Sequence, residues 1–325
     1  MKLPRRRFLH LAAGAAALPA GSRLAWTQAY PTRVVRWIVP YPPAGPTDII
    51  ARTLCPWLSE RLGQQFIVEN RPGATGNVGT EMVVRSPPDG HTLLAVGAPH
   101  AINATLFEKL NFDFIRDIAP VAIIMRAPLV MLVNPLVPAR TVPEFIAYAK
   151  ANPARVNMAS AGSGSPQHVT GELFKMMTGI NTLHVPYRGS APALTDLIGG
   201  QVQLMFDSTP ASIGYIRAGT LRLLAVTTSS RSEALPDVPS LGDFLPGFES
   251  STWYGLGAPR STPVHVIEKL NREISIALVD PKIKARLHDL GGSALVDSPD
   301  NFGKLIADET EKWAKVVKFS GAKPD

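Results

Sequence analysis

The stretch that decides the fold is YPPAGPTDIIARTL, residues 41–54, which follows the apolar run VVRWIVP at 34–40. The apolar run predicts a buried strand, and the apolar spacing after Pro46 predicts a helix. The turn between them consists of prolines, an alanine and Gly45, without lysine or arginine. A helix N-terminus exposes unpaired N–H groups and a partial positive charge. The turn is therefore suited to binding an anion through its backbone.

The same unit of strand, glycine-rich turn and helix occurs again in NMASAGSGSPQHVTGELF, residues 157–174. Gly162 and Gly164 clear space beside the backbone, serine hydroxyls add donors, and Pro166 stands where a first helical residue is expected. A single turn of this kind often only connects two elements. Two of them in one chain favour a pair of anion-binding loops.

Strand-like runs alternate with helix-like runs along almost the whole chain, which is typical of helices packed on mostly parallel sheets. Two copies of one unit so far apart indicate two lobes. We expect extended crossings between them near LVMLVNP at 129–135 and ESSTWYG at 249–255. The prediction is an α/β protein in which residues 30–131 and 253–325 form lobe 1, and residues 132–252 form lobe 2, with a cleft between the lobes.

Local sequence signals predict where individual helices begin and where one of them is interrupted. Thr141 and Glu144 match a capping box. Thr47 or Asp48 is expected to cap the helix of the opening stretch. Pro56 lies inside that same helix, so we expect the helix to be kinked or split there.

Residues 1–29 combine a basic cluster with a short Ala/Leu-rich run, as in a cleaved signal peptide. The pair Arg5 and Arg6 resembles the twin-arginine export signal imperfectly, so the general secretory route stays open. This segment holds five basic residues and no acidic one, so its removal lowers the formal charge from +7 to +2. We therefore predict a periplasmic protein with no nucleic acid partner.

Residue types of catalytic and metal sites occur, but without the required spacing. Ser163, Ser165, His168 and Asp207 supply the types of a hydrolase triad, yet SAGSGSP is not G-x-S-x-G and the order differs from that of α/β-hydrolases. No H-E-x-x-H, C-x-x-C or Walker-type motif appears, so we expect no metal and no cofactor. The single cysteine, Cys55, is expected to be buried and inert.

Three further features border the predicted site. Arg188 offers a forked contact to a carboxylate, or forms a surface ion pair. Asp207 ends a predicted strand and either accepts a hydrogen bond from a ligand or caps the next helix. The loop NRPGATGNVGTE, residues 70–81, lacks the spacing of the dinucleotide fingerprint. We expect it to shape the cleft wall and to reach the ligand through Asn77 or Thr80.

Six motifs, in order along essentially the whole mature chain, resemble one known family. The chain looks like the Bug-type receptors, the periplasmic solute-binding proteins of tripartite tricarboxylate transporters. The motifs are YPTRVVRWIVPYPPAGPTDIIAR (30–52), VENRPGATGNVGTE (68–81), SPPDGHTLL (86–94), SAGSGSPQHVTGELF (160–174), HVPYRGSAPALTDLIGGQVQLMFD (184–207) and LPDVPSLGD (235–243). The resemblance implies a two-lobed periplasmic-binding-protein fold of type II that closes on a small organic acid.

In that family one carboxylate is held by the two loops, largely through backbone N–H groups and ordered waters. The residues that match those loops here are Tyr41, Ala44, Gly45, Thr47 and Asp48 in lobe 1, and Ser160, Ala161, Gly162, Ser165 and His168 in lobe 2, with Asp207 near the same end. Ala44 stands where the family commonly has a glycine. The family's distal wall matches GAPHAIN (97–103) and VPYRGSAP (185–192), and no particular ligand follows from these segments.

The resemblance implies a receptor that hands a small organic carboxylate to a membrane permease of the tripartite tricarboxylate type. A monomer is expected, because a hinged receptor must keep its cleft and lobe tips free. Two alternatives are a binding module that signals to a membrane sensor and a serine hydrolase.

Overall fold

The computed structural model describes residues 30–324, with the exception of 44, 154 and 233–234. The strands are β1 (Val35–Val39), β2 (Phe66–Asn70), β3 (Thr92–Gly97), β4 (Ile118–Val133), β5 (Asn157–Ser160), β6 (Leu183–Pro186), β7 (Leu204–Ser208), β8 (Arg222–Val226), β9 (Ser251–Pro259) and β10 (Ser293–Ala294). The predicted signal peptide lies outside the described residues.

Helices separate almost all of these strands. They are α1 (Pro46–Leu62), α2 (Asn77–Val84), α3 (Ala98–Leu106), α4 (Phe114–Asp117), α5 (Val142–Ala151), α6 (Pro166–Thr178), α7 (Ser190–Ile198), α8 (Thr209–Arg217), α9 (Val264–Val279), α10 (Pro281–Asp289) and α11 (Pro299–Ser320), with short 3-10 turns η2 (Ala74–Gly76) and η3 (Leu241–Asp243). None of the helices in the described part of the chain is long and apolar enough to cross a membrane.

The strands form one continuous mixed sheet in the order β2-β1-β3-β9-β4-β7-β5-β6, and β8 and β10 also pair with β4. Parallel pairs lie at both ends: β1 with β2 and β3, and β5 with β6 and β7. The pairs made by β4 and β9 are antiparallel. Each end of the sheet is therefore parallel, as predicted, and the middle strands that connect the ends are not.

The long strand β4 passes between the two halves of the sheet. β4 pairs with β9 in one half of the molecule and with β7 and β8 in the other. The apolar runs VAIIM (121–125) and LVMLV (129–133) both belong to this one strand. Pro128, between them, lies where the pairing of β4 with β9 ends and that with β7 begins. The lobe boundaries predicted from the sequence stay a prediction.

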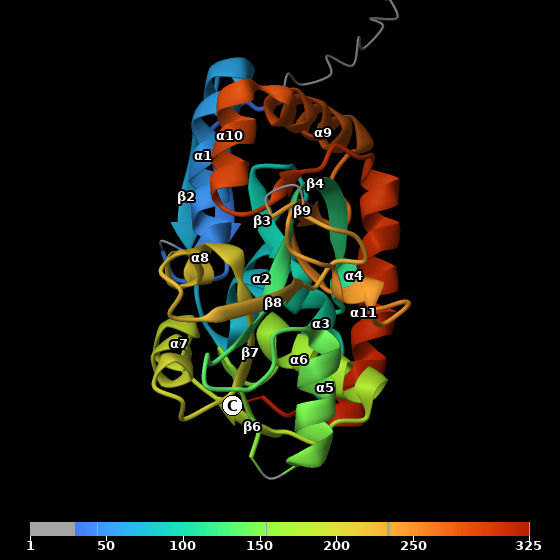
Figure 1. Ribbon diagram of the computed structural model, residues 1–325. Coiled ribbons are helices and arrows are strands. Elements are labelled where there is room, and N and C mark those ends of the chain that lie inside the picture. Colours follow the sequence, from blue (N-terminus) through green and yellow to red (C-terminus); the bar gives the residue numbers. More distant parts are fainter. Residues whose placement is uncertain (1–29, 44, 154, 233–234, 325) are drawn as a thin grey trace, which may run out of the picture.

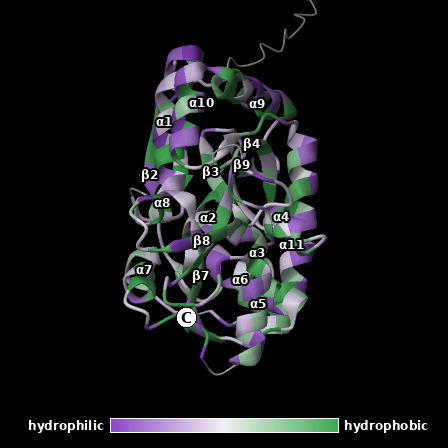
Figure 2. Ribbon diagram, viewed as in Figure 1, coloured by the Kyte–Doolittle hydropathy of each residue, from purple (hydrophilic) through white to green (hydrophobic). Residues whose placement is uncertain are grey.

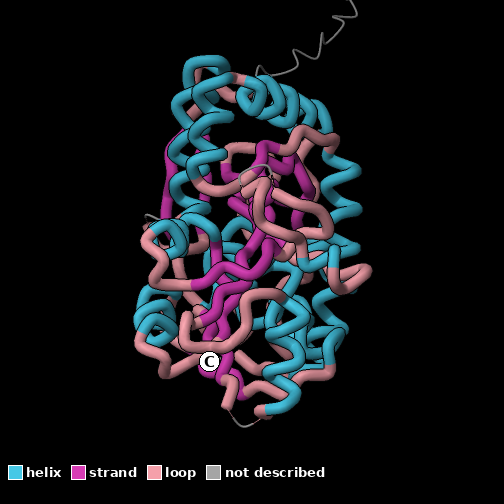
Figure 3. Tube along the Cα trace, in the orientation of Figure 1, coloured by secondary structure: helices cyan, strands magenta, loops and turns pink. Residues whose placement is uncertain are grey.

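Figure 1 shows how the helices cover the sheet. α1, α9 and α10 surround the half that contains β1–β3, α5–α8 surround the half that contains β5–β7, and α11 runs along both. The strands run through the middle of the molecule with helices outside them (Figure 3). Stripes of hydrophilic and hydrophobic residues alternate on α1 and α11 (Figure 2), as expected for helices with one buried face. The largest fully buried side chains include Trp37, Trp253 and Trp313.

α1 departs from the sequence-based expectation at two points. It is one helix from Pro46 to Leu62 and is not split at Pro56; the proline removes a single backbone donor, and burial of the apolar face of the helix stabilises the rest. The N-cap is Gly45, without a capping side chain, so the expected cap at Thr47 or Asp48 is wrong. Cys55 is buried as predicted, and burial raises the pKa of its thiol to about 12, which keeps it unreactive.

Candidate functional site

The register of the strands brings both glycine-rich loops to the junction between the two halves of the sheet. β7 runs antiparallel to β4, and its last residue, Ser208, pairs with Leu129 where β4 passes between the halves. β5 is parallel to β7, so it ends on the same side. β9 begins opposite Pro128, and β3 ends opposite Tyr254 near that start. Because β1 is parallel to β3, the loops that follow β1 and β5 both reach this junction.

The first loop leads from β1 into α1. Gly45 has extended backbone (φ −77°, ψ 166°), and Pro46 is the first helical residue. Among the described residues no side chain caps this helix, so the backbone of its first turn, at Thr47, carries no capping side chain. Ala44 lies outside the described residues.

Asp48, at the start of α1, links this loop to its surroundings. Its carboxylate is buried and accepts hydrogen bonds from Arg52 Nε and Asn70 Nδ2, both at 2.9 Å. Asn70 Nδ2 also donates to the carbonyl oxygen of Tyr41 at 3.0 Å. Asp48 therefore joins α1 to the end of β2 and fixes the shape of the first loop.

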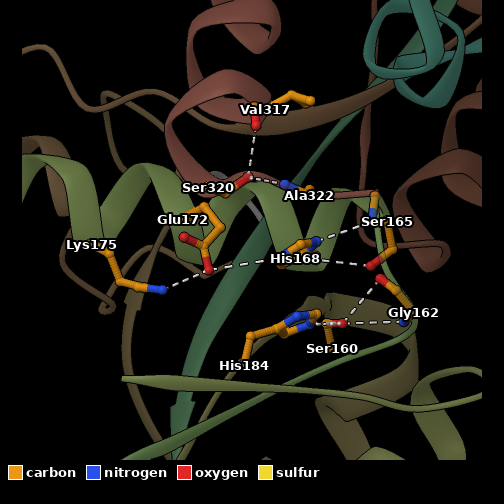
Figure 4. Close-up of polar contacts among 11 residues, drawn as sticks. Ser160, Gly162, Ser165, His168, Glu172, Lys175, His184, Val317, Ser320 and Ala322 are labelled. Carbon is orange, nitrogen blue, oxygen red and sulfur yellow. Dashed lines mark hydrogen bonds and ion pairs between the residues drawn. The ribbon is translucent and has the colours of Figure 1, made fainter. Parts of the chain in front are cut away.

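The second loop, between β5 and α6, is held by internal hydrogen bonds (Figure 4). Ser165 caps α6 by accepting from the His168 N–H at 3.2 Å, and Pro166 follows as the first helical residue, as predicted. The N–H of Gly162 donates to Ser160 Oγ, and the N–H of Gly164 donates to His168 Nδ1. Both glycines have positive φ, 133° and 72°. Their N–H groups thus hold the shape of the loop.

A cluster of titratable side chains lies next to the second loop. The rings of His168 and His184 stack with centroids 3.6 Å apart, and His184 Nε2 lies 2.6 Å from Ser160 Oγ. Glu172 is buried against His168 (3.7 Å) and Lys175 (2.9 Å). Burial alone would raise the pKa of Glu172, but the hydrogen bonds from His168 and Lys175 outweigh it and hold that pKa below its usual value. His168 therefore orients the loop, as the sequence indicated.

Asp207 ends β7 and is completely buried. Its carboxylate accepts from Ser190 Oγ at 2.7 Å, from Ser212 Oγ at 2.8 Å and, more weakly, from Gln167 Nε2 at 3.4 Å. Burial raises the pKa of Asp207, and these hydrogen bonds offset only part of the effect. The carboxylate thus ties together the N-terminal parts of α6, α7 and α8.

Two predicted residues lie at the edge of this network. Ala161 accepts a hydrogen bond from the Gly189 N–H at 3.2 Å, which joins the second loop to the start of α7. Arg188 precedes that glycine, is exposed, and forms no ion pair within the described residues. Its guanidinium is therefore available to a charged group of a ligand.

In the described part of the chain, Ser165, His168 and Asp207 do not form the contacts of a hydrolase triad. Ser165 contacts His168 only through the backbone N–H of His168, and His168 Nδ1 accepts from Gly164. Asp207 bonds to serine hydroxyls and an amide, not to an imidazole. Within the described residues, no group of three or more His, Cys, Asp or Glu side chains could hold a metal ion.

α3 connects the two loops, a role that the sequence did not reveal. His100 on α3 makes an edge-on contact with the ring of Tyr41, with centroids 6.4 Å apart. At the other end of the helix, Leu106 lies so close to Gly164 that an added Cβ there would be 2.1 Å from Leu106 Cδ2. Asn103, between them, donates to the Thr75 carbonyl of the third glycine-rich loop at 3.0 Å. The sequence matched GAPHAIN (97–103) to the distal wall of the family but carried no signal for these contacts.

Comparison with known proteins identifies the family of this chain. The sequence profile of the tripartite tricarboxylate transporter family receptors matches residues 50–321. The chain belongs to this receptor family. It is 38% identical to the protein BugT of Bordetella pertussis over 297 residues, which cover 90% of this chain and 91% of BugT.

Two solved receptor structures agree over nearly the whole described chain. The R. palustris protein Rpa4515 with adipate has a TM-score of 0.80 and 36% identity, and the match covers 91% of this chain and 100% of that one. MatC (Rpa3494) from Rhodopseudomonas palustris, with bound malate, has a TM-score of 0.75 and 34% identity, and the match covers 89% of this chain and 100% of that one. Members of the family are periplasmic solute-binding receptors and not enzymes, as predicted for this chain.

His100 should make the free energy of unfolding of the protein depend on pH. Its Nδ1 accepts from the Gly97 N–H at 3.1 Å, and its Nε2 lies 3.0 Å from Thr80 Oγ, whose hydroxyl donates to Gly76. Burial lowers the pKa of His100 from 6.5 to about 4. As the pH falls, the unfolded chain binds a proton on this ring near pH 6.5, whereas the folded protein does so only near pH 4. The free energy of unfolding should therefore fall by about 3 kcal/mol as the pH drops from 6.5 to 4.

Denaturant titrations between pH 4 and 7 measure this effect. We expect His100→Gln to lose this part of the pH dependence. His265→Gln, at an exposed position, should keep the wild-type profile. Equal slopes for the two variants would show that His100 does not carry the effect.

Proposed function

We propose that this receptor captures a small organic carboxylate in a cleft between two lobes and delivers it to a permease of the tripartite tricarboxylate type. The observation that carries the proposal is the convergence of two helix N-termini, those of α1 and α6, on the junction of the sheet halves. Each adds a partial positive charge, and α6 adds the N–H of Gln167, since the His168 N–H already donates to Ser165. Two such termini facing one carboxylate bind it without requiring a basic side chain.

The ligands of the relatives support the carboxylate assignment. Adipate is bound to one structural neighbour and malate to the other. In our proposal the first turns of α1 and α6 hold one carboxylate with ordered waters, and Arg188 reaches a second acidic group. Tyr41, Gly45, Thr47, Ser160, Ala161, Gly162, Ser165 and His168 form or support the two loops, and Asp48 and Asp207 act only by positioning them.

The same proposal includes the predicted lobe boundaries, export through a cleaved signal peptide, and a monomeric receptor. Lobe 1 would comprise residues 30–131 and 253–325, and lobe 2 residues 132–252. The extended segments of β4 and β9 between the sheet halves support this division, because few backbone torsions there would need to change on closure.

A thermal-shift screen tests the function. The mature protein, unfolded and refolded to remove carried-over ligand, is mixed with mono-, di- and tricarboxylates and with the corresponding amides. A ligand at about a hundred times its dissociation constant adds about 2.7 kcal/mol, which should raise Tm by several degrees. We expect acids to raise Tm and their amides to leave it unchanged. The carboxylate assignment would be contradicted if only the amides raised Tm, or if no acid of a broad panel raised it.

A further inference from the structure

Three buried polar atoms near the first loop have no hydrogen-bond partner within the described residues. They are Tyr41 Oη, Asn77 Nδ2 and Asn103 Oδ1. The Asn77 and Asn103 side chains belong to residues that are only 8% and 2% exposed. An unsatisfied buried donor or acceptor costs about 1–3 kcal/mol. Such a group in a folded protein therefore calls for an explanation, such as a functional role or a bound water or ion.

The hydrogen bonds that do form fix the direction of both amides. Asn103 Nδ2 donates to the Thr75 carbonyl and to Asn77 Oδ1, each at 3.0 Å, which uses both of its N–H groups. Asn103 therefore presents an acceptor, Oδ1, and Asn77 presents a donor, Nδ2. The hydroxyl of Tyr41 lies near Gly76, the residue before Asn77, since a Cβ added to Gly76 would be 3.1 Å from it.

This polar cluster lies between the two carboxylate-binding loops. Tyr41 belongs to the first loop. Asn103 and Leu106 are three residues apart on α3 and so share one face of the helix. Leu106 touches Gly164 in the second loop. A ligand whose carboxylate is held at the two helix N-termini would place its neighbouring atoms next to these three groups.

The cluster contains hydrogen-bonding groups but no charge. Its members are two amides and a phenol. The ionisable group in contact with them, His100, has a pKa of about 4 because it is buried, so it is neutral at pH 7. Arg52, the nearby cation of α1, is paired with Asp48. These three side chains offer a second carboxylate no positive charge, whereas a hydroxyl could donate to one amide and accept from the other.

We propose that Tyr41, Asn77 and Asn103 form a neutral subsite that recognises a hydroxyl group close to the bound carboxylate. The ligand class is then a small hydroxycarboxylate. This inference rests on the proposed carboxylate function and narrows it. The ligand hydroxyl donates to Asn103 Oδ1 and accepts from Asn77 Nδ2, and Tyr41 Oη supplies a further contact.

Isothermal titration calorimetry with matched acids tests the subsite. The probes are malate against succinate and 3-hydroxybutyrate against butyrate, each pair differing by one hydroxyl. We expect wild-type protein to bind the hydroxy acid of at least one pair more tightly by about tenfold or more. In Tyr41→Phe and in Asn77→Asp, the ratio of the two dissociation constants of each pair should be close to one. The aspartate keeps the acceptor for Asn103, loses the donor and adds a negative charge, which should weaken both acids of a pair and leave their ratio to report the donor.

The control for the phenol is Tyr187→Phe. Its hydroxyl donates to Asp196 at 2.6 Å, so its loss should reduce stability and leave the ligand ratio unchanged. Tyr41→Phe should not reduce stability, because that hydroxyl has no partner to lose. If both acids of each pair bind wild type equally, or if the preference survives both variants, the subsite is refuted while the carboxylate function stands. If no acid binds, the proposed function itself fails.

Discussion

Asp207→Ala is expected to lower the free energy of unfolding by about 3 kcal/mol and Tm by roughly 6–12 °C. The carboxylate is buried and accepts from Ser190 and Ser212 with short hydrogen bonds. Alanine would leave these buried hydroxyls and the weaker donor on Gln167 without an acceptor. Since the three donors belong to three different helices, the loss should loosen the whole end of lobe 2 that faces the junction.

Two further variants distinguish a role of Asp207 in positioning the helices from a direct contact with the ligand. Asp207→Asn keeps one acceptor oxygen, so it should recover part of the stability and retain ligand affinity. Asp196→Ala, on the same α7 helix, removes one partly exposed hydrogen bond from Tyr187 and should cost about 1 kcal/mol or less. Denaturant unfolding gives the stabilities and calorimetry gives the affinities. A stable Asp207→Asn protein that no longer binds would assign Asp207 to the ligand site instead.

Much of the architecture could be predicted because its signals are local. The apolar runs before the two glycine-rich turns became β1 and β5, and the prolines at 46 and 166 begin α1 and α6. Thr141 accepts from the Glu144 N–H at 3.3 Å, although the Glu144 carboxylate accepts from Arg140 and not from the cap itself. Capping, helix starts and strand runs depend on a few neighbouring residues, so a sequence pattern suffices for them.

The parts that could not be predicted depend on contacts between distant residues. Asp48 looked like a cap, but the amide of Asn70, more than twenty positions later, takes one of its carboxylate oxygens. The same holds for Asn77 and Asn103, whose pairing requires α2 and α3 to lie side by side. No spacing rule connects such positions, because tertiary packing decides which side chains meet.

The second glycine-rich loop should lose its ligand when its backbone can no longer keep its shape. Gly162 has a φ of 133°, which L side chains rarely adopt, and its N–H and carbonyl groups bond to Ser160 and Ser165. We expect Gly162→Val to displace the start of α6 and remove its N–H groups from the carboxylate. If two charge-assisted hydrogen bonds are lost, affinity should fall by about a hundredfold or more.

A matched variant separates this effect from general backbone strain. Gly179 ends the same helix, also has positive φ (69°), and has open space where a Cβ would be. Gly179→Val should therefore cost about 1–3 kcal/mol of stability, as Gly162→Val does, and leave binding intact. Calorimetry of both folded variants decides the assignment. If Gly162→Val binds the acid as tightly as Gly179→Val, the second loop does not hold the carboxylate, and α1 must do so with groups outside that loop.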